Sequence, residues 1–124
     1  MTVTYTEIPE KRRCEFTVSG HISYDDYLAV AEPMEAFAKT HGKVQMIEVV
    51  DHFTGFDPAV LLPGIRFDFR VVPHVSHIAL VTDIGWISPI ARAVGALLPT
   101  RMRVFPRDQL EAAREWLDAE LEGG

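Results

Sequence analysis

The sequence has 124 residues, a length that suits one compact domain, and we predict a single domain over residues 1–124. Hydrophobic residues make up 48% of the chain and charged residues 24%, a balance that excludes an intrinsically disordered protein. The net charge of −6 argues against a nucleic-acid partner, because phosphate backbones select basic surfaces.

The first two predicted elements are strands. Residues 2–8 alternate between apolar and polar side chains, residues 9–11 interrupt the pattern with a proline, and residues 14–18 resume it. The sequence therefore predicts an N-terminal β-hairpin.

A helix is predicted next, beginning after Ser23 and closing at Gly42. Ser23 precedes Asp26 by three residues, which is an acidic variant of the capping box that starts many helices. Pro33 is expected to kink this helix. Apolar side chains repeat at helical spacing at Tyr27, Ala31, Met34 and Ala38.

Short runs rich in β-branched residues predict the rest of the sheet. Residues 44–50 and 77–82 are bounded by turn residues and suit parallel strands that are covered on both faces. Residues 102–105 predict a further strand, and a closing helix follows, in which we expect Trp116 to be buried against the sheet. The apolar stripe of this helix consists of Leu110, Ala113, Leu117 and Leu121.

Two segments have ambiguous patterns. Residues 65–71 alternate as a strand would, but Asp57 and Pro58 form a good helix start and two parallel strands need a long crossover between them. We therefore predict a helix over residues 58–72. Residues 86–98 predict another helix, in which Arg92 is the only charged residue. Because apolar side chains occur on nearly every side of this helix, we expect something besides water to cover it.

Cysteine content and hydropathy bear on location. Cys14 is the only cysteine, which excludes an intramolecular disulfide and fits a reducing compartment. We find neither an apolar signal-peptide core nor an apolar run of about 18 residues. The expectation is a cytoplasmic protein without a membrane span.

The order of these motifs resembles the STAS/SEC14 family of bacterial SpoIIAA-like proteins over nearly the whole chain. The resemblance rests on Tyr24 to Tyr27, Gly42 with Lys43, Asp51 with Phe53 and Gly55, His77 to Asp83 with Trp86, Arg103 to Phe105, and Ala113, Trp116 and Leu117. It implies an α/β fold with a mixed sheet of about five strands flanked by about four helices. Most members of the family are uncharacterised, and a nonpolar small molecule held between mobile helices is the ligand usually suggested for them.

The chain departs from the anti-sigma-factor antagonists of this fold at one motif. Those proteins carry a phosphorylatable serine in an Asp-Ser turn, whereas the corresponding loop here reads Asp51-His52-Phe53-Thr54-Gly55. We therefore predict that Thr54 is not a phosphorylation switch, and that it is a turn residue before a glycine.

The polar residues give little support to catalysis or to a cofactor. His52, His74 and His77 lack the spacing of metal ligands, no serine occupies a nucleophile elbow, and no glycine-rich phosphate loop occurs. We predict no enzyme, no metal and no cofactor. Three polar residues near predicted strand ends, where open α/β sheets commonly bind ligands, remain candidates to orient one: Asp51, His52 and Asp83.

An apolar set supplies the main functional hypothesis, although ordinary core packing is the alternative for each member. Its residues belong to the two ambiguous segments and to the loops before them: Phe53, Phe56, Phe67, Phe69, Trp86 and Ile90. With the three polar residues they predict a pocket for a small nonpolar or lipid-like ligand between helices 58–72 and 86–98. The alternative is a protein-interaction module, in which helix 86–98 forms a homodimer or docks a regulatory partner, as in anti-sigma-factor antagonists.

Overall fold

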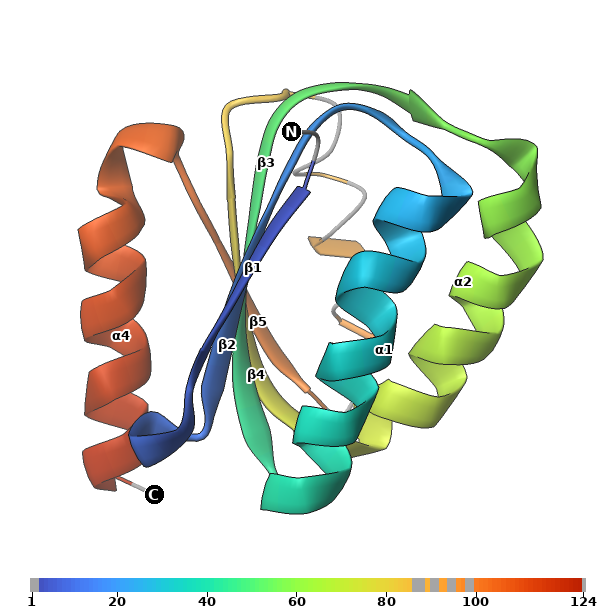
Figure 1. Ribbon diagram of the computed structural model, residues 1–124. Coiled ribbons are helices and arrows are strands. Elements are labelled where there is room, and N and C mark those ends of the chain that lie inside the picture. The colour runs from blue at the N-terminus through green and yellow to red at the C-terminus, as the bar shows by residue number, and fades with distance from the viewer. Residues whose placement is uncertain (1–2, 86–88, 90–91, 94–95, 98–99, 124) are drawn as a thin grey trace.

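A five-stranded sheet forms the centre of the molecule in the computed structural model, which describes residues 3–85, 89, 92–93, 96–97 and 100–123 (Figure 1). The strands follow one another across the sheet in chain order: β1 (Val3–Ile8), β2 (Arg13–Ile22), β3 (Val44–Phe56), β4 (Val75–Thr82) and β5 (Arg101–Phe105). Strand β1 is antiparallel to β2, and the other neighbours are parallel. The predicted hairpin and mixed sheet are confirmed.

Helices cover both faces of this sheet. Helices α1 (Tyr24–His41) and α2 (Pro58–Val71) lie on one face, and α4 (Leu110–Gly123) lies on the other (Figure 1). The described residues thus contain three α-helices rather than the predicted four. Most of the predicted helix over residues 86–98 lies outside them. Three short 3-10 helices complete the described elements: η1 (Pro9–Lys11), η2 (Val72–His74) and η3 (Arg107–Gln109).

The start of α1 is fixed by the predicted capping box. The Ser23 hydroxyl accepts a hydrogen bond from the Asp26 backbone N–H at 3.1 Å, and the Asp26 carboxylate accepts one from the Ser23 N–H at 3.0 Å. The helix continues through Pro33, and Gly42 closes it with a φ of 75° and a backbone hydrogen bond to Ala38. The sequence therefore located both ends of α1.

Asp57 also contributes to the start of α1, although the sequence suggested it as the cap of α2. Its carboxylate accepts hydrogen bonds from His21 Nε2 at 2.7 Å and from the Tyr24 backbone N–H at 3.2 Å. The His21 hydrogen bond is the main reason that the pKa of Asp57 lies below its usual value. A negative charge at a helix N-terminus is stabilised by the helix dipole. Asp57 thus links the two helices on this face.

The ambiguous segment 65–71 is helical, as the crossover argument predicted, because it belongs to α2 between the parallel strands β3 and β4. Strand β3, in contrast, is longer than the sequence indicated. It continues past Val50 to Phe56 beside β2, with register shifts around Gly20. The segment from Asp51 to Gly55, expected to be a loop, is therefore part of a strand, and Thr54 is an exposed strand residue.

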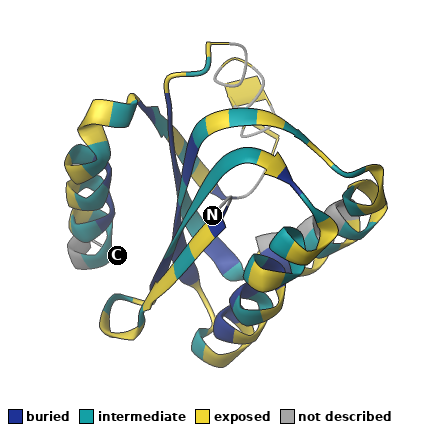
Figure 2. Ribbon diagram, turned by 45° about the horizontal axis from the view of Figure 1, so that its top comes forward, coloured by how far each residue is buried: buried dark blue, intermediate teal, exposed yellow. Residues whose placement is uncertain are grey.

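Each face of the sheet has its own apolar core, as the buried residues in Figure 2 indicate. Met34 and Phe37 of α1 pack with Val44 and Met46 on one face. On the other face, Leu117 of α4 is fully buried in a cluster with Ile47, Val49, Ala79 and Val81. Trp116 lies at the edge of this second core, where its ring centroid is 6.0 Å from that of Phe105. The residue is half-buried and therefore less buried than the sequence predicted.

A polar network joins α4 to the sheet beside the second core. Arg13 is 2% exposed, and its guanidinium donates hydrogen bonds to Gln45 Oε1 at 2.8 and 3.0 Å and to Asp118 at 2.8 Å. The Gln45 amide in turn donates to the Leu117 carbonyl at 2.8 Å. The Arg13 hydrogen bond is the main cause that lowers the pKa of Asp118. The side chain of Gln45 is thus the centre of the contact between strand and helix.

Candidate functional site

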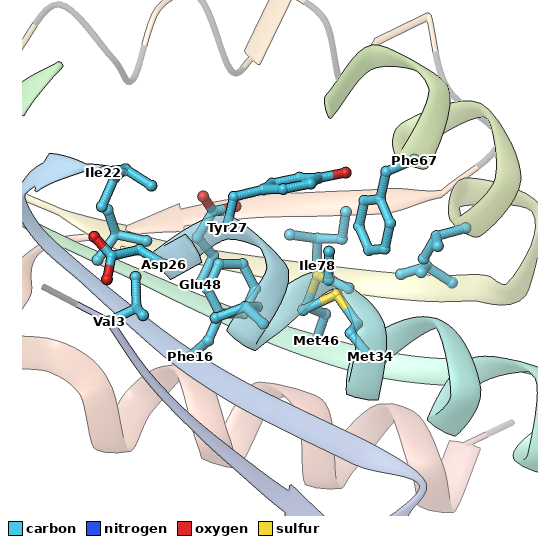
Figure 3. A pocket seen from close by; sticks show the side chains of 15 residues that line it. Val3, Phe16, Ile22, Asp26, Tyr27, Met34, Met46, Glu48, Phe67 and Ile78 are labelled. Carbon is cyan, nitrogen blue, oxygen red and sulfur yellow. The ribbon is translucent and has the colours of Figure 1, made fainter. Parts of the chain in front are cut away.

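The candidate site is a cavity of about 230 Å³ between the sheet and the helices α1 and α2 (Figure 3). Its floor consists of side chains from the strands, and its roof of side chains from the two helices. Most of the 15 lining residues are apolar. They include Val3, Phe16, Ile22, Met34, Met46 and Ile78.

Contacts between α1 and α2 hold the roof of the cavity together. The Tyr27 hydroxyl donates a hydrogen bond to the Pro63 carbonyl at 3.0 Å, and the Tyr27 ring meets the Phe67 ring edge-on with centroids 6.2 Å apart. Farther along the helices, Arg70 Nε donates to Glu35 at 2.8 Å, and this hydrogen bond lowers the pKa of Glu35. The two helices therefore form one cover.

The cavity also has polar groups. Asp26 and Glu48 contribute carboxylates, and Tyr27 contributes its ring. Figure 3 shows both carboxylates toward the half of the cavity that contains Val3 and Ile22. Glu48 is half-buried in the middle of β3, where its register partners are Phe16 on β2 and Leu80 on β4. An apolar chamber with a few polar groups is typical of small-molecule sites.

The predicted apolar set is spread over different places. Phe67 lines the cavity, where it contacts Tyr27. Phe53 and Phe56 lie near the end of β3 with ring centroids 6.3 Å apart, and Phe56 is 43% exposed. Phe69 belongs to α2, but its side chain is not described. Two further members, Trp86 and Ile90, lie outside the described residues.

The three predicted polar residues meet at η3 rather than at the cavity. Asp83 accepts a hydrogen bond from the Arg107 backbone N–H at 2.9 Å, and Asp51 lies 3.6 Å from the Arg107 guanidinium. His52 Nε2 is 3.6 Å from Asp51, and the His52 side chain is largely exposed. Asp83 therefore caps the segment that follows β5, and Asp51 forms an ion pair with the same arginine.

Most of the cavity residues were not candidates from the sequence. Val3, Phe16 and Met46 have the inward positions of ordinary strands, so their pattern does not distinguish a cavity wall from solid core. Glu48 is the residue that carried a usable signal, because it is an acid inside the apolar run of residues 44–50.

Cys14 offers no catalytic nucleophile beside this cavity. It is fully buried under the first core, and burial raises the pKa of its thiol to about 12. Nucleophilic cysteines are reactive as thiolates, so a thiol with this pKa is inert near neutral pH. Within the described part of the chain, no three His, Cys, Asp or Glu side chains are grouped to hold a metal ion.

Comparison with known proteins places the fold. The sequence matches a family described as SpoIIAA-like over residues 13–118. A solved structure with a similar fold is that of an uncharacterised protein from the DUF3478 family, with a SpoIIAA-like fold, from Shewanella loihica PV-4. It has 13% sequence identity and a TM-score of 0.73, and the alignment covers 93% of this chain and 91% of that one.

No curated protein has significant sequence similarity to the chain. None of the described helices is long and apolar enough to cross a membrane.

Proposed function

Because the chain belongs to the SpoIIAA-like family, we propose that it is a non-enzymatic binding domain whose cavity under α1 and α2 holds a small nonpolar molecule. The observation that carries this proposal is the cavity itself, which lies between the sheet and two helices and is lined mostly by apolar side chains. The cavity is partly open to solvent, and concave, mostly apolar spaces with a few polar groups are the usual form of small-molecule sites. A space of this size therefore suits a ligand.

The size of the cavity limits the ligand. An engineered apolar cavity of about 150 Å³ is enough to bind benzene, whereas drug-sized ligands use pockets of about 300 Å³ or more. The cavity here, at about 230 Å³, lies between these values. A single substituted ring or a short alkyl chain fits this volume better than a complete phospholipid does.

Filling the cavity from the helix side is expected to abolish binding. Ala31 of α1 lines the cavity and is 6% exposed, so the Ala31→Leu variant places three additional carbon atoms in the ligand space. We expect the affinity for toluene or hexanol to fall at least about ten-fold, because the apolar contact area is replaced by protein. Titration followed by NMR of the Met34 and Met46 methyl groups measures this effect.

The matched control is Ala36→Leu, which makes the same change on an exposed position of α1. Its affinity should remain within about two-fold of that of the original protein, since exposed substitutions away from the site have small effects. Equal affinities in the two variants would place the nonpolar ligand elsewhere and would contradict the proposal.

An exposed apolar surface supports a second function, association with another protein chain. Tyr24, Phe56, Leu61 and Leu62 are between 39% and 55% exposed. They belong to the starts of α1 and α2 and the end of β3, which Asp57 ties together. Exposed apolar patches on small domains often mark interaction sites.

A charged double variant tests this second function. If the apolar surface buries itself against a second copy, Leu61→Asp with Leu62→Asp should shift the protein from dimer to monomer, because each buried carboxylate would lose its hydration. Native mass spectrometry at micromolar concentration gives the two populations. A monomeric mass for the unaltered protein would reject the homodimer, and Glu32→Asp, an exposed site on α1, is the control.

A further inference from the structure

A second pocket, of about 210 Å³, lies where the strands β2, β3 and β4 begin, beside the end of α4. Most of its described lining residues are polar: Arg12, Lys43, Gln45, Ser76, His77 and Glu120. With His77 neutral, two cations and one acid give this lining a net positive charge. The whole chain, in contrast, has a net charge of −6. The second pocket is therefore a basic site on an acidic protein.

Arg12 has a backbone conformation that is unfavourable for arginine. Its φ is 48°, and among the described residues other than glycine it alone has a positive φ. The residue follows η1, where its N–H bonds to the Pro9 carbonyl and its own carbonyl accepts from the Gln45 N–H at 2.8 Å. Glycine is the usual residue at such a left-handed end, because it has no Cβ to clash. An arginine at this position indicates that its side chain has a use beyond the turn.

The Arg12 side chain is exposed and forms no ion pair with the described part of the chain. Other arginines pair with a carboxylate, namely Arg13, Arg70, Arg101, Arg107 and Arg114. The Arg12 guanidinium therefore keeps its N–H donors, which form a planar fork that matches the oxygens of a carboxylate or phosphate. It is available to an anion from outside the chain.

Lys43 supplies the second cation, directly before β3. Its Nζ donates one hydrogen bond to the Pro73 carbonyl at 2.6 Å, which leaves two of its three donors for another acceptor. Because a carbonyl carries no net charge, this contact positions the ammonium group without neutralising it. Lys43 thus adds a fixed positive charge to the wall of the pocket.

Glu120 is the acid among the described lining residues, and its charge is compensated by other side chains. Its carboxylate is 3.5 Å from Arg101 Nη1 and 3.5 Å from His77 Nε2. The ion pair with Arg101 offsets the negative charge of Glu120. Arg12 and Lys43 are consequently the two charges of the pocket without a carboxylate partner among the described residues.

We propose that this pocket binds the oxyanion group of a small molecule, a phosphate or a carboxylate, between Arg12 and Lys43. The guanidinium forms paired hydrogen bonds to two oxygen atoms, and the ammonium group adds a point charge. The pocket volume is several times the volume of a water molecule, so it also has room for part of the body that carries the oxyanion.

Two small anions test the site in the unaltered protein. Inorganic phosphate and acetate are titrated separately at pH 7 and low ionic strength, and sodium chloride at matched ionic strength is the reference. The backbone amide signals of Gln45, Ser76 and His77 report binding by NMR. We expect phosphate to bind with a Kd of about 1 mM, the strength of two charge-assisted hydrogen bonds, and acetate to bind more weakly because its charge is smaller. Tighter binding of acetate would assign the site to a carboxylate.

Arg12→Gly separates binding from folding. Glycine suits a φ of 48°, so the urea midpoint should not fall, whereas the affinity for phosphate should fall about ten-fold. Lys43→Gln should reduce the affinity by a similar factor. Arg66→Gln removes a positive charge from an exposed position of α2 outside the pocket, and its affinity should remain within about two-fold of that of the original protein.

Two results would overturn the oxyanion site. The first is an unchanged phosphate affinity in Arg12→Gly, and the second is amide shifts with phosphate and acetate that are no larger than those with chloride. Neither result bears on the nonpolar ligand, because the two pockets share no described lining residue.

Discussion

Leu117→Ala is expected to lower the free energy of unfolding by about 4 kcal/mol, because it removes buried methyl groups from the core under α4. Leu117 is fully buried and packs in the cluster that contains Ile47, Val81 and Phe105. The neighbouring side chains come from three different strands, so they cannot collapse together into the space that the mutation leaves. Urea denaturation followed by circular dichroism measures the loss.

Leu97→Ala is the matched control, because Leu97 is also a leucine but is 86% exposed. Its effect should remain within about 0.5 kcal/mol, as is usual for exposed substitutions. Similar losses at both positions would mean that α4 is not seated on the sheet through Leu117.

Gln45→Leu is expected to cost about 3 kcal/mol, although leucine is the more hydrophobic residue. The Gln45 amide accepts from two nitrogen atoms of Arg13 and donates to the Leu117 carbonyl. Leucine can neither accept from the Arg13 guanidinium nor donate to the Leu117 carbonyl. A buried donor on a charged side chain, such as that of Arg13, is costly to leave unpaired. The same substitution at Gln109, which is exposed, should change the free energy of unfolding by less than about 0.5 kcal/mol.

A double variant separates the lost hydrogen bonds from a simple packing defect. In Arg13→Met with Gln45→Leu, the buried charge is removed together with its partner, and replacing a buried polar pair by apolar residues is often nearly neutral. We expect the double variant to be more stable than Gln45→Leu alone. If the two substitutions are simply additive, the network does not hold α4 in the way described.

The sequence predicted the fold well where local chemistry and topology agreed. Ser23, Asp26 and Gly42 carry the end signals of α1, and the structure has both ends there. The alternating residues 65–71 illustrate the opposite case, because their local pattern favours a strand. Parallel strands need a long crossover between them, and this requirement correctly predicted the helix α2 between β3 and β4.

The cavity was harder to predict, because it depends on contacts between distant segments. Val3 on β1, Tyr27 on α1 and Ile78 on β4 each satisfy the pattern of an ordinary core residue. Whether such residues fill a space or surround it depends on the distance between helix and sheet, which periodicity does not encode. Phe67 was a candidate because it lies in an ambiguous segment, whereas Glu48 is an acid in an apolar strand and matches no functional motif.

The order of the strands has a consequence for how the chain folds during synthesis. Every strand pairs with the one that precedes it in the chain, from the β1–β2 hairpin to β5, so the sheet can grow in the order in which the ribosome releases it. The sheet face that contains Ile47, Val49 and Val81 is buried later, because it is covered by α4, which is synthesised after all five strands. Until then this face is exposed on a nascent chain, and chaperones that recognise apolar surface have their longest opportunity to bind there.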